Sequence, residues 1–386
     1  LNPAINNFLT ALIAEKDQYA LASLDISTGE FKVTVNSDFD KIISELSRSC
    51  ARECLIPQKL FDDYQNTQFP ETRQKILYTP LENWVFELSF TLELLQKHFE
   101  VSTLDGFACK DQPLAVRAAG AVLDYASRNL RQDAGHITKL ETYSLNDALE
   151  LDTISLRNLE IVEPMFAGQK GNTLLSILDY TATPMGGRKL RNCLMRPLCD
   201  HQKIIERLDA VGQFKDDPMT AAELRELLGA VRDLERITGR INIGSANPKD
   251  MIALANSLSM LPGIKTILGY YPVPLLETLQ TQIGTFPELC DKIIASIEEN
   301  PPTAVNEGGI FRPGCSELLD ELRSAATEGK KWLSQIQQRE QERTNIKSLK
   351  VKFNQVFGFY IEISKSNLDL VPDDYIRKQT LVNAER

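Results

Sequence analysis

Apolar and polar positions follow two different rhythms along this chain, and the change falls near residue 154. In the first 132 residues, short apolar stretches alternate with helical patterns. Residues 31–35 (FKVTV) alternate apolar and polar side chains as an antiparallel strand does, and Ser27-Thr28-Gly29 before them is typical of a turn. This alternation favours an α/β domain. The predicted elements are strands at residues 19–25, 31–35 and 53–56 and a helix at residues 38–48.

After residue 154 the pattern is almost wholly helical. Thr183 followed by Pro184 predicts a helix start, because the hydroxyl can cap the first turn and proline lacks only an N–H that would have no helical partner. Gly186 and Gly187 inside this helix cost about 1 kcal/mol each relative to alanine, which indicates close backbone packing. Further short helices are predicted at residues 200–214 and 248–260.

A long helix is predicted from about Ser316, after breaks at Pro301-Pro302, Gly308-Gly309 and Pro313-Gly314. Its apolar residues recur at three- and four-residue steps, a spacing typical of a coiled-coil-like seam. Thirty helical residues would span about 45 Å. The predicted seam consists of Leu318, Leu322, Ala325, Gly329, Trp332 and Ile336.

Composition and charge narrow the function classes. At 386 residues the chain is too long for one ordinary core, so two or three domains are expected. It is 42% hydrophobic and 25% charged, as soluble globular proteins are, and its apolar runs are shorter than a membrane span. The net charge of −10 argues against a surface covered with nucleic-acid-binding groups. Residues 339–386, however, hold nine Lys and Arg against seven Asp and Glu, so DNA contact is expected only near this end.

The cysteines are seven in number and scattered. Cys50 and Cys54 have no second pair at the spacing of zinc ligands, so buried thiols in a reducing cytoplasm are expected and a metal site is not. The other five are Cys109, Cys193, Cys199, Cys290 and Cys315.

Two segments near the end of the chain carry aromatic, basic and amide residues: residues 353–365 (FNQVFGFYIEISK) and 371–386 (VPDDYIRKQTLVNAER). They resemble the DNA clamp of the MutS family of mismatch-repair proteins. Residues 173–198 resemble the core of that family, and residues 24–31 resemble its connector domain. The resemblance implies a multidomain fold, α/β and then mainly α. Its expected parts are a ribonuclease H-like connector domain at 1–132, a linker at 133–153, a helical core and lever domain at 154–340, and a partial β-rich clamp at 341–386.

Charged and amide side chains near strand tips suit phosphate oxygens, and such contacts position DNA without reading its bases. By the resemblance, Asn354, Lys378 and Asn383 fall where the clamp touches the DNA backbone. Val382 departs from the family pattern, which often has lysine there, so a weaker grip is expected. A merely solvated strand face is the alternative for each residue. The predicted backbone-contacting residues are Asn354, Lys365, Arg377, Lys378, Gln379 and Asn383. The aromatic residues Phe357, Phe359 and Tyr360 are expected to pack within the clamp, with base stacking as the alternative.

Other candidate sites are interpreted as structural. Asp25 could serve as the metal-binding aspartate of a ribonuclease H nuclease, but the sequence offers no convergent carboxylates for two metal ions, so a strand-end turn residue is expected. Phe-Pro-Glu at residues 69–71 and 286–288 matches the family's mismatch-reading tripeptide in the wrong region and is interpreted as chance. Salt bridges between packed helices are expected for Arg188, Arg191 and Arg196. Surface or helix-end positions are expected for His98, His136 and His201.

The predicted function is DNA mismatch repair, as a non-catalytic segment that links mismatch-binding and ATPase domains and clamps duplex DNA. No G-x-x-x-x-G-K-[ST] loop occurs, so no cofactor is expected in this segment, and ATP and magnesium would belong to the parent protein. Leu1 in place of Met predicts an excised segment that stops before the ATPase.

The resemblance also implies partners for the parent: mismatched double-stranded DNA, a second copy in a homodimer, and a MutL-type protein at the connector. A cytoplasmic, nucleoid-associated location without membrane contact is expected. Two other classes stay open, a metal-dependent ribonuclease H-like nuclease and a coiled-coil scaffold.

Overall fold

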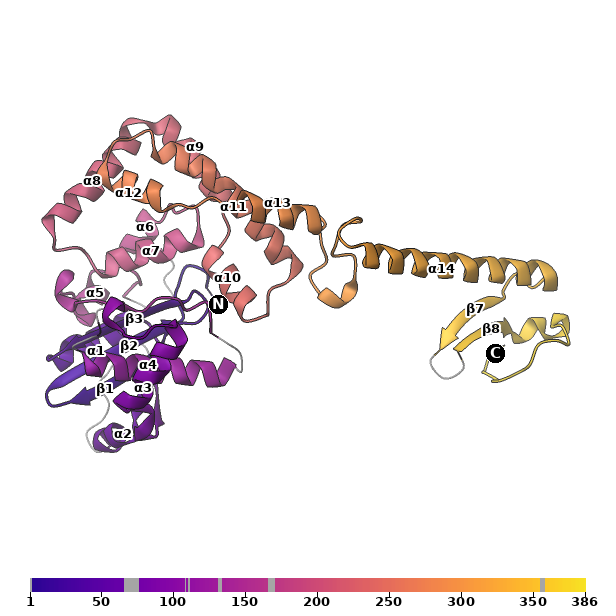
Figure 1. The fold of residues 1–386 in the computed structure, drawn as a ribbon, viewed down its shortest axis with the longest axis horizontal. Coiled ribbons are helices and arrows are strands. Elements are labelled where there is room, and N and C mark those ends of the chain that lie inside the picture. Colours follow the sequence, from indigo (N-terminus) through magenta and orange to yellow (C-terminus); the bar gives the residue numbers. More distant parts are fainter. Residues whose placement is uncertain are drawn as a thin grey trace. The chain divides into compact units, whose positions relative to one another are not determined.

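The computed structural model describes residues 2–65, 76–107, 109, 112–130, 134–165, 171–354 and 358–386, without the side chains of residues 64, 65, 130, 330 and 354. The chain divides into two compact units, Leu1–Ile310 and Phe311–Arg386 (Figure 1). The first unit holds a mixed α/β sheet followed by a helical region, as the hydrophobic pattern predicts.

The sheet of the first unit has six strands in the order β5-β4-β1-β2-β3-β6. The first three strands along the chain form an antiparallel meander, β4 and β5 continue parallel to β1, and β6 lies parallel to β3. Three of the strands, β2, β3 and β4, confirm the predicted ones, whereas β1, β5 and β6 were not predicted. The bounds are β1 Leu9–Glu15, β2 Gln18–Asp25, β3 Glu30–Asn36, β4 Glu53–Pro57, β5 Leu77–Leu81 and β6 Glu141–Thr142.

Helices cover both faces of this sheet. Alternate residues of a strand point to opposite faces. Leu24 and Leu55 therefore join a core with α4 (Pro113–Leu130), behind which lies α3 (Leu88–Phe99). Leu21 and Ile56 join the opposite core, under α1 (Phe39–Arg48) and α2 (Gln58–Gln65). The helix α1 confirms the predicted one, because Asp38 caps its first turn.

The segment after α4 is packed against the sheet. Ala134, Ile137 and Leu140 are each 1% exposed and belong to the core under α4. β6 then adds to the sheet beside β3. The first ten residues of the expected linker, 133–153, thus contribute to the α/β domain wherever the structure describes them.

The helical region starts at α5 and its helices begin at local signals that the sequence shows. Thr183 accepts a hydrogen bond from Gly186 N at 3.0 Å and Pro184 opens α7, which confirms the predicted start. Asp200 caps α8 in the same way. The bounds are α5 Thr153–Asn158, α6 Leu174–Leu178, α7 Pro184–Met195, α8 His201–Asp216, α9 Pro218–Ala230, α10 Leu234–Asn242, α11 Pro248–Leu268, α12 Pro274–Gln282 and α13 Pro287–Ser296.

The helix α11 is longer than predicted, because it continues through Pro262 to Leu268. Among the described residues it alone has the length and apolar composition of a membrane span. A core helix of a soluble protein has the same properties, and α11 packs against α9, α10, α12 and α13. Ala255, Ile264 and Ile267 are buried in these contacts.

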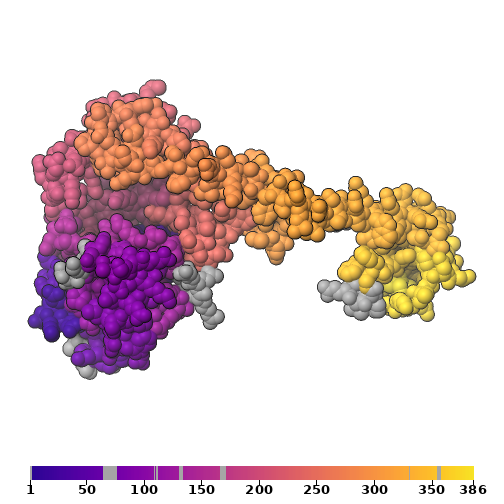
Figure 2. Space-filling model, in the orientation of Figure 1, coloured from indigo at the N-terminus to yellow at the C-terminus, as the bar shows by residue number. Residues whose placement is uncertain are grey.

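The second unit consists of α14 (Glu317–Thr344) and a three-stranded sheet, β7 (Lys350–Asn354), β8 (Gly358–Ser364) and β9 (Ala384–Glu385). Ser316 caps α14, so the predicted long helix is confirmed. A small core of Ile346, Leu349 and Ile363 joins the strands to the end of the helix. On the face shown in Figure 2, the yellow atoms of the last residues gather at one end of the orange helix α14.

Candidate nucleic-acid interface and the charge network of the first unit

The predicted DNA-contacting residues lie in or beside the three-stranded sheet of the second unit, where the last segment of the chain turns back on itself. β8 pairs with β7 on one side and with β9 on the other, antiparallel in both cases. The backbone N–H groups of Lys378 and Gln379 donate to the carbonyl of Arg386, at 2.8 and 3.1 Å. Leu381 N donates to Ala384 O at 2.8 Å and closes a turn. The turn residue Asn383 lies beside Lys365, because Lys365 N donates to Asn383 O at 3.1 Å.

This arrangement leaves some of the predicted side chains free and engages others. Lys365, Lys378 and Asn383 are exposed, and their side chains make no hydrogen bond or ion pair with another described residue. Arg377 instead pairs with Glu385 at 3.2 Å, and the Gln379 side-chain oxygen accepts from Arg386 at 3.1 Å. The side chain of Asn354 lies outside the part of the chain that the structure describes.

The neighbouring charges are mostly neutralised. Lys352 and Arg386 both donate to Glu362, at 2.7 and 2.8 Å, and these hydrogen bonds lower the pKa of that carboxyl. Arg386 also stacks over the ring of Tyr360, 4.8 Å from its centroid. The cations that stay available near this sheet therefore include Lys365 and Lys378. They can meet phosphate oxygens without giving up a partner in the described chain.

The aromatic residues of the two strands were expected to pack within the clamp, and they do so only in part. Phe359 lies against Phe353 with ring centroids 5.0 Å apart, yet both rings are about 60% exposed. Tyr360 supports Arg386, so its face is used within the clamp. Phe357 lies outside the described residues.

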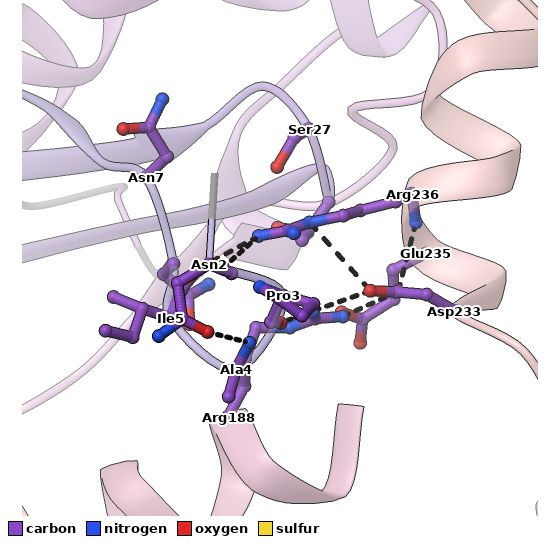
Figure 3. A network of polar contacts seen from close by, with 12 residues as sticks. Asn2, Pro3, Ala4, Ile5, Asn7, Ser27, Arg188, Asp233, Glu235 and Arg236 are labelled. Carbon is purple, nitrogen blue, oxygen red and sulfur yellow. Dashed lines mark hydrogen bonds and ion pairs between the residues drawn. The ribbon is translucent and has the colours of Figure 1, made fainter. Parts of the chain in front are cut away.

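A second polar cluster joins the start of the chain to two helices of the helical region (Figure 3). Arg188 of α7 is 6% exposed and donates to Asp233 at 2.8 Å, to Glu235 at 2.6 Å and to the carbonyl of Pro3 at 2.7 Å. Burial acts to raise the pKa of Asp233, but the hydrogen bond and charge of Arg188 outweigh it and the pKa of that carboxyl is lowered. Arg236 completes the cluster by donating to Ile5 O at 2.9 Å.

A third set of contacts links α7 to α1. Arg196 donates to Glu45 at 3.1 Å and stacks on Tyr143, whose hydroxyl donates to the same carboxylate at 2.9 Å. Burial and the charge of Glu45 raise the pKa of Tyr143 well above its ordinary value, so Tyr143 stays a neutral donor. Neither Glu45 nor Tyr143 was predicted to take part in a site, because their pairing joins residues 98 apart in the sequence.

The comparison with protein families tests the family resemblance found in the sequence. The model of MutS domain II matches residues 7–138, and the model of MutS domain III matches residues 154–367, more than half of the chain. The chain belongs to the MutS family. The resemblance of residues 173–198 is thereby confirmed at the level of the family; the matched model also covers residues 353–365, whereas residues 371–386 lie beyond it.

Curated relatives agree with this assignment. A "DNA mismatch repair protein MutS" of Methanococcoides burtonii is 41% identical over 389 residues, which cover 99% of this chain and 44% of that protein. Proteins of the same name from Lachnoclostridium phytofermentans and Halothermothrix orenii are 38% and 40% identical, with 41% and 42% of their lengths covered. The chain therefore spans less than half the length of the relatives it matches.

Within this MutS chain, the three arginines of the core block form salt bridges, as predicted. Arg188 bridges α7 to the start of α10, and Arg191 pairs with Glu163 at 3.3 Å. Arg196 reaches Glu45 of α1 in domain II, whereas the partner of Arg191 lies outside the helices, so this pair differs from the predicted bridge between packed helices.

Asp25 is a strand-end turn residue, as predicted, although it closes β2 and not the first strand. It is fully buried, and its carboxylate accepts from Asn7 N at 2.9 Å and from the N–H and hydroxyl of Ser27 at 2.9 and 2.7 Å. Both carboxylate oxygens are thus used in fixing the turn. Among the described residues no group of three His, Cys, Asp or Glu could hold a metal ion.

The remaining motifs have structural roles where the structure describes them. Phe286-Pro287-Glu288 forms the start of α13, with Phe286 at the cap position, whereas residues 69–71 lie outside the described residues. His98 lies in the last turn of α3 and His201 opens α8, both at helix ends as predicted. His136 differs, because it lies in a loop with its Nε2 2.6 Å from Ile26 O.

Proposed function

We propose that this chain is the part of a DNA mismatch repair protein that connects its other domains and holds duplex DNA by the phosphate backbone. The observation that carries the proposal is the match to MutS domains II and III at about 40% identity to proteins named for mismatch repair. Lys365, Lys378 and Asn383 support it from the structure, because they combine exposure with free donor groups on one strand edge.

The domain plan of the proposal follows the family. We assign residues 1–132, with the packed segment 134–142, to the connector domain, the rest of residues 133–153 to a linker, 154–340 to the core and lever, and 341–386 to part of the clamp. A ribonuclease H-like fold for the connector is supported by the order β5-β4-β1-β2-β3 with an antiparallel meander and two parallel strands. In this proposal the fold serves as a connector and not as a nuclease, because both oxygens of the Asp25 carboxylate already accept hydrogen bonds that fix the turn.

The lever part of the proposal rests on α14. Its predicted seam is open in this chain, with Leu318 66%, Leu322 60% and Trp332 60% exposed. An apolar helix seam of this kind is stable when another helix covers it. We propose that a further segment of the parent protein packs there, which would give a paired lever. A coiled-coil scaffold is the second candidate function, because the same seam could pair two copies.

The partners and cofactors of the parent are proposals of the same kind. Mismatched double-stranded DNA, a second copy in a homodimer and a MutL-type partner at the connector are expected of it, in the cytoplasm. ATP and magnesium would bind outside the two matched domains, which leaves this part of the protein non-catalytic.

Lys378→Ala in the full-length protein tests the proposal. Removing one phosphate contact should weaken binding to matched and mismatched duplex alike and should flatten the slope of log affinity against log salt by about one. Asn383→Ala should weaken binding with an unchanged slope, because asparagine releases no counterion. Binding isotherms across a salt series measure both effects.

The matched control is Lys292→Ala, which removes an equally exposed lysine from α13 without touching the clamp. It should leave both affinity and slope unchanged. A loss confined to mismatched DNA, or a slope unaffected by Lys378→Ala, would contradict the assignment of these residues to the DNA backbone.

A further inference from the structure

A small cavity lies where domain II meets α7 of domain III, and its lining is rich in cations. It has a volume of about 70 Å³, well above the roughly 10–15 Å³ that one water requires. This is room for a tetrahedral oxyanion and too little to enclose a nucleoside. Its lining side chains include Lys32, Arg48, Arg188, Arg191 and Arg196, against the carboxylates of Glu30 and Glu45.

Most of these charges are already paired. Lys32 contacts Glu30, and Arg188 is fully engaged by Asp233, Glu235 and Pro3 (Figure 3). The pairing around Glu45 is incomplete, however. This single carboxylate, 8% exposed, is shared by Arg196 at 3.1 Å and Arg48 at 3.3 Å. Two guanidinium groups, 19% and 10% exposed, therefore share one buried carboxylate.

Two further observations indicate that an acceptor is lacking in the cavity. Arg48 donates through Nη1 to Glu45 at 3.3 Å and through Nη2 to Leu151 O at 2.8 Å, whereas its buried Nε has no hydrogen-bond partner among the described residues. Arg191 is 8% exposed, and its ion pair is with Glu163, a residue 40% exposed, at a distance of 3.3 Å. A buried donor such as Arg48 Nε is costly unless an anion or water supplies an acceptor.

We propose that this cavity binds a small oxyanion of the inorganic phosphate type, held mainly by Arg191 and Arg48. The planar, forked guanidinium group is suited to tetrahedral oxyanions because it donates two parallel hydrogen bonds. Arg48 belongs to the end of α1 in domain II and Arg191 to α7 in domain III. The bound anion would thus join the two domains, and its loss would weaken their contact.

Equilibrium dialysis of the 386-residue chain against radiolabelled inorganic phosphate, at constant ionic strength in chloride, tests the proposal. One saturable site per chain is expected. Arg191→Gln should weaken binding by about tenfold or more, because a charge-assisted hydrogen bond is worth roughly 1.5–3 kcal/mol. Glu163→Gln should act in the opposite direction and tighten binding, since it removes the carboxylate that competes for Arg191.

If Arg191→Gln folds poorly, Glu163→Gln still tests the proposal, because its expected effect is the opposite one. Thermal unfolding of each variant in phosphate and in chloride gives a second readout. The matched control Arg207→Gln removes an exposed arginine of α8 and should change nothing. No saturable binding, or binding that both Arg191→Gln and Glu163→Gln leave unchanged, would mean an adventitious ion only and would overturn the proposal. If AMP binds as tightly as inorganic phosphate and responds to the same variants, the oxyanion site stands and its ligand is the phosphate of a nucleotide.

Discussion

The charged residues of this chain owe their roles to their partners more than to their type. Lys378 and Arg377 are sequence neighbours, yet the Lys378 side chain has no partner among the described residues and Arg377 is paired with Glu385. Arg188 and Arg191 lie one helical turn apart, yet Arg188 donates to three acceptors and Arg191 pairs with one partly exposed carboxylate, at 3.3 Å. A basic residue in the clamp or core is therefore a DNA or anion contact only where the fold leaves it without a closer partner.

Asp233→Asn tests the contribution of a buried pair through its pH dependence. Burial alone would raise the pKa of Asp233, but Arg188 lowers it below the ordinary value of about 3.9. A carboxyl whose folded pKa is lowered contributes stability above the unfolded pKa, and this contribution is lost as pH falls through the folded pKa. The variant should therefore be less stable than the wild type at pH 7 and should lose less stability between pH 4 and pH 2. Urea unfolding at stepped pH measures this.

The control for this experiment is Asp209→Asn, an exposed residue of α8 with no hydrogen-bond partner among the described residues. It should follow the wild-type curve. Since the pKa values of Asp250, Glu340 and Glu362 are also lowered by their partners, Asp233→Asn should remove only part of the acid sensitivity. An acid limb as steep as that of the wild type would contradict the proposed weight of the pair.

At the scale of the elements, the surroundings of two glycines show which helix is closely packed and which faces open space. An added Cβ at Gly120 of α4 would lie 2.3 Å from Thr91 Cβ of α3, whereas an added Cβ at Gly212 of α8 meets nothing within 4 Å. Gly120→Ala should therefore lower the free energy of unfolding by roughly 1–3 kcal/mol through overpacking. Gly212→Ala should raise it by up to about 1 kcal/mol, because alanine favours the helix.

Denaturant unfolding of the two variants beside the wild type checks this pair. The two substitutions add the same methyl group to a helix, so any difference between them reports the neighbouring element. A Gly120→Ala protein as stable as Gly212→Ala would mean that α3 and α4 are not packed as closely as described.

Local sequence signals predicted most of the elements, and the wrong predictions also arose from local features of the sequence. The caps at Asp38, Thr183 and Ser316 lie within a few residues of the groups they satisfy, so the sequence displays them. β1 was missed because LTALIAE is a nearly continuous apolar run without alternation, typical of a central strand buried on both faces. α11 was cut short because proline usually ends a helix, while here Pro262 is accommodated within it.

The candidate site was predictable only in part for the same reason. Family resemblance and side-chain chemistry pointed to the segment of Lys365, Lys378 and Asn383. Which of its cations are free depends on the turn that brings Arg386 back beside Gln379, and on the pairing of Glu362 across three strands. The contacts between Glu45, Tyr143 and Arg196 span 98 and 151 residues, so no short motif reveals them.

At the scale of the whole molecule, the first unit depends on polar contacts between its two domains. Residues 2–7 lead into the sheet of domain II, but their carbonyls at Pro3 and Ile5 accept from Arg188 and Arg236 of domain III. Gly239 of α10 adds a close approach, because a Cβ there would lie 2.7 Å from Ser27 O. The entry into domain II is therefore fixed on two helices of domain III.

Arg188→Ala should release this anchoring. The variant leaves the partly buried Asp233 with Arg236 as its remaining cation, at 3.8 Å, so the expected loss of stability is smaller than the roughly 3–5 kcal/mol found when a fully buried pair is broken. The amides of Ala4, Ile5 and Asn7 should exchange with deuterium faster, together with those at the start of α10, while the strands of the sheet core stay protected. Hydrogen exchange resolved by peptide measures this, with Arg207→Ala as the control on α8. Loss of a local anchor should loosen residues 2–7 before it loosens the core of domain II. Unchanged exchange in residues 2–7, or an equal loss of protection throughout the sheet, would therefore show that Arg188 does not anchor this segment.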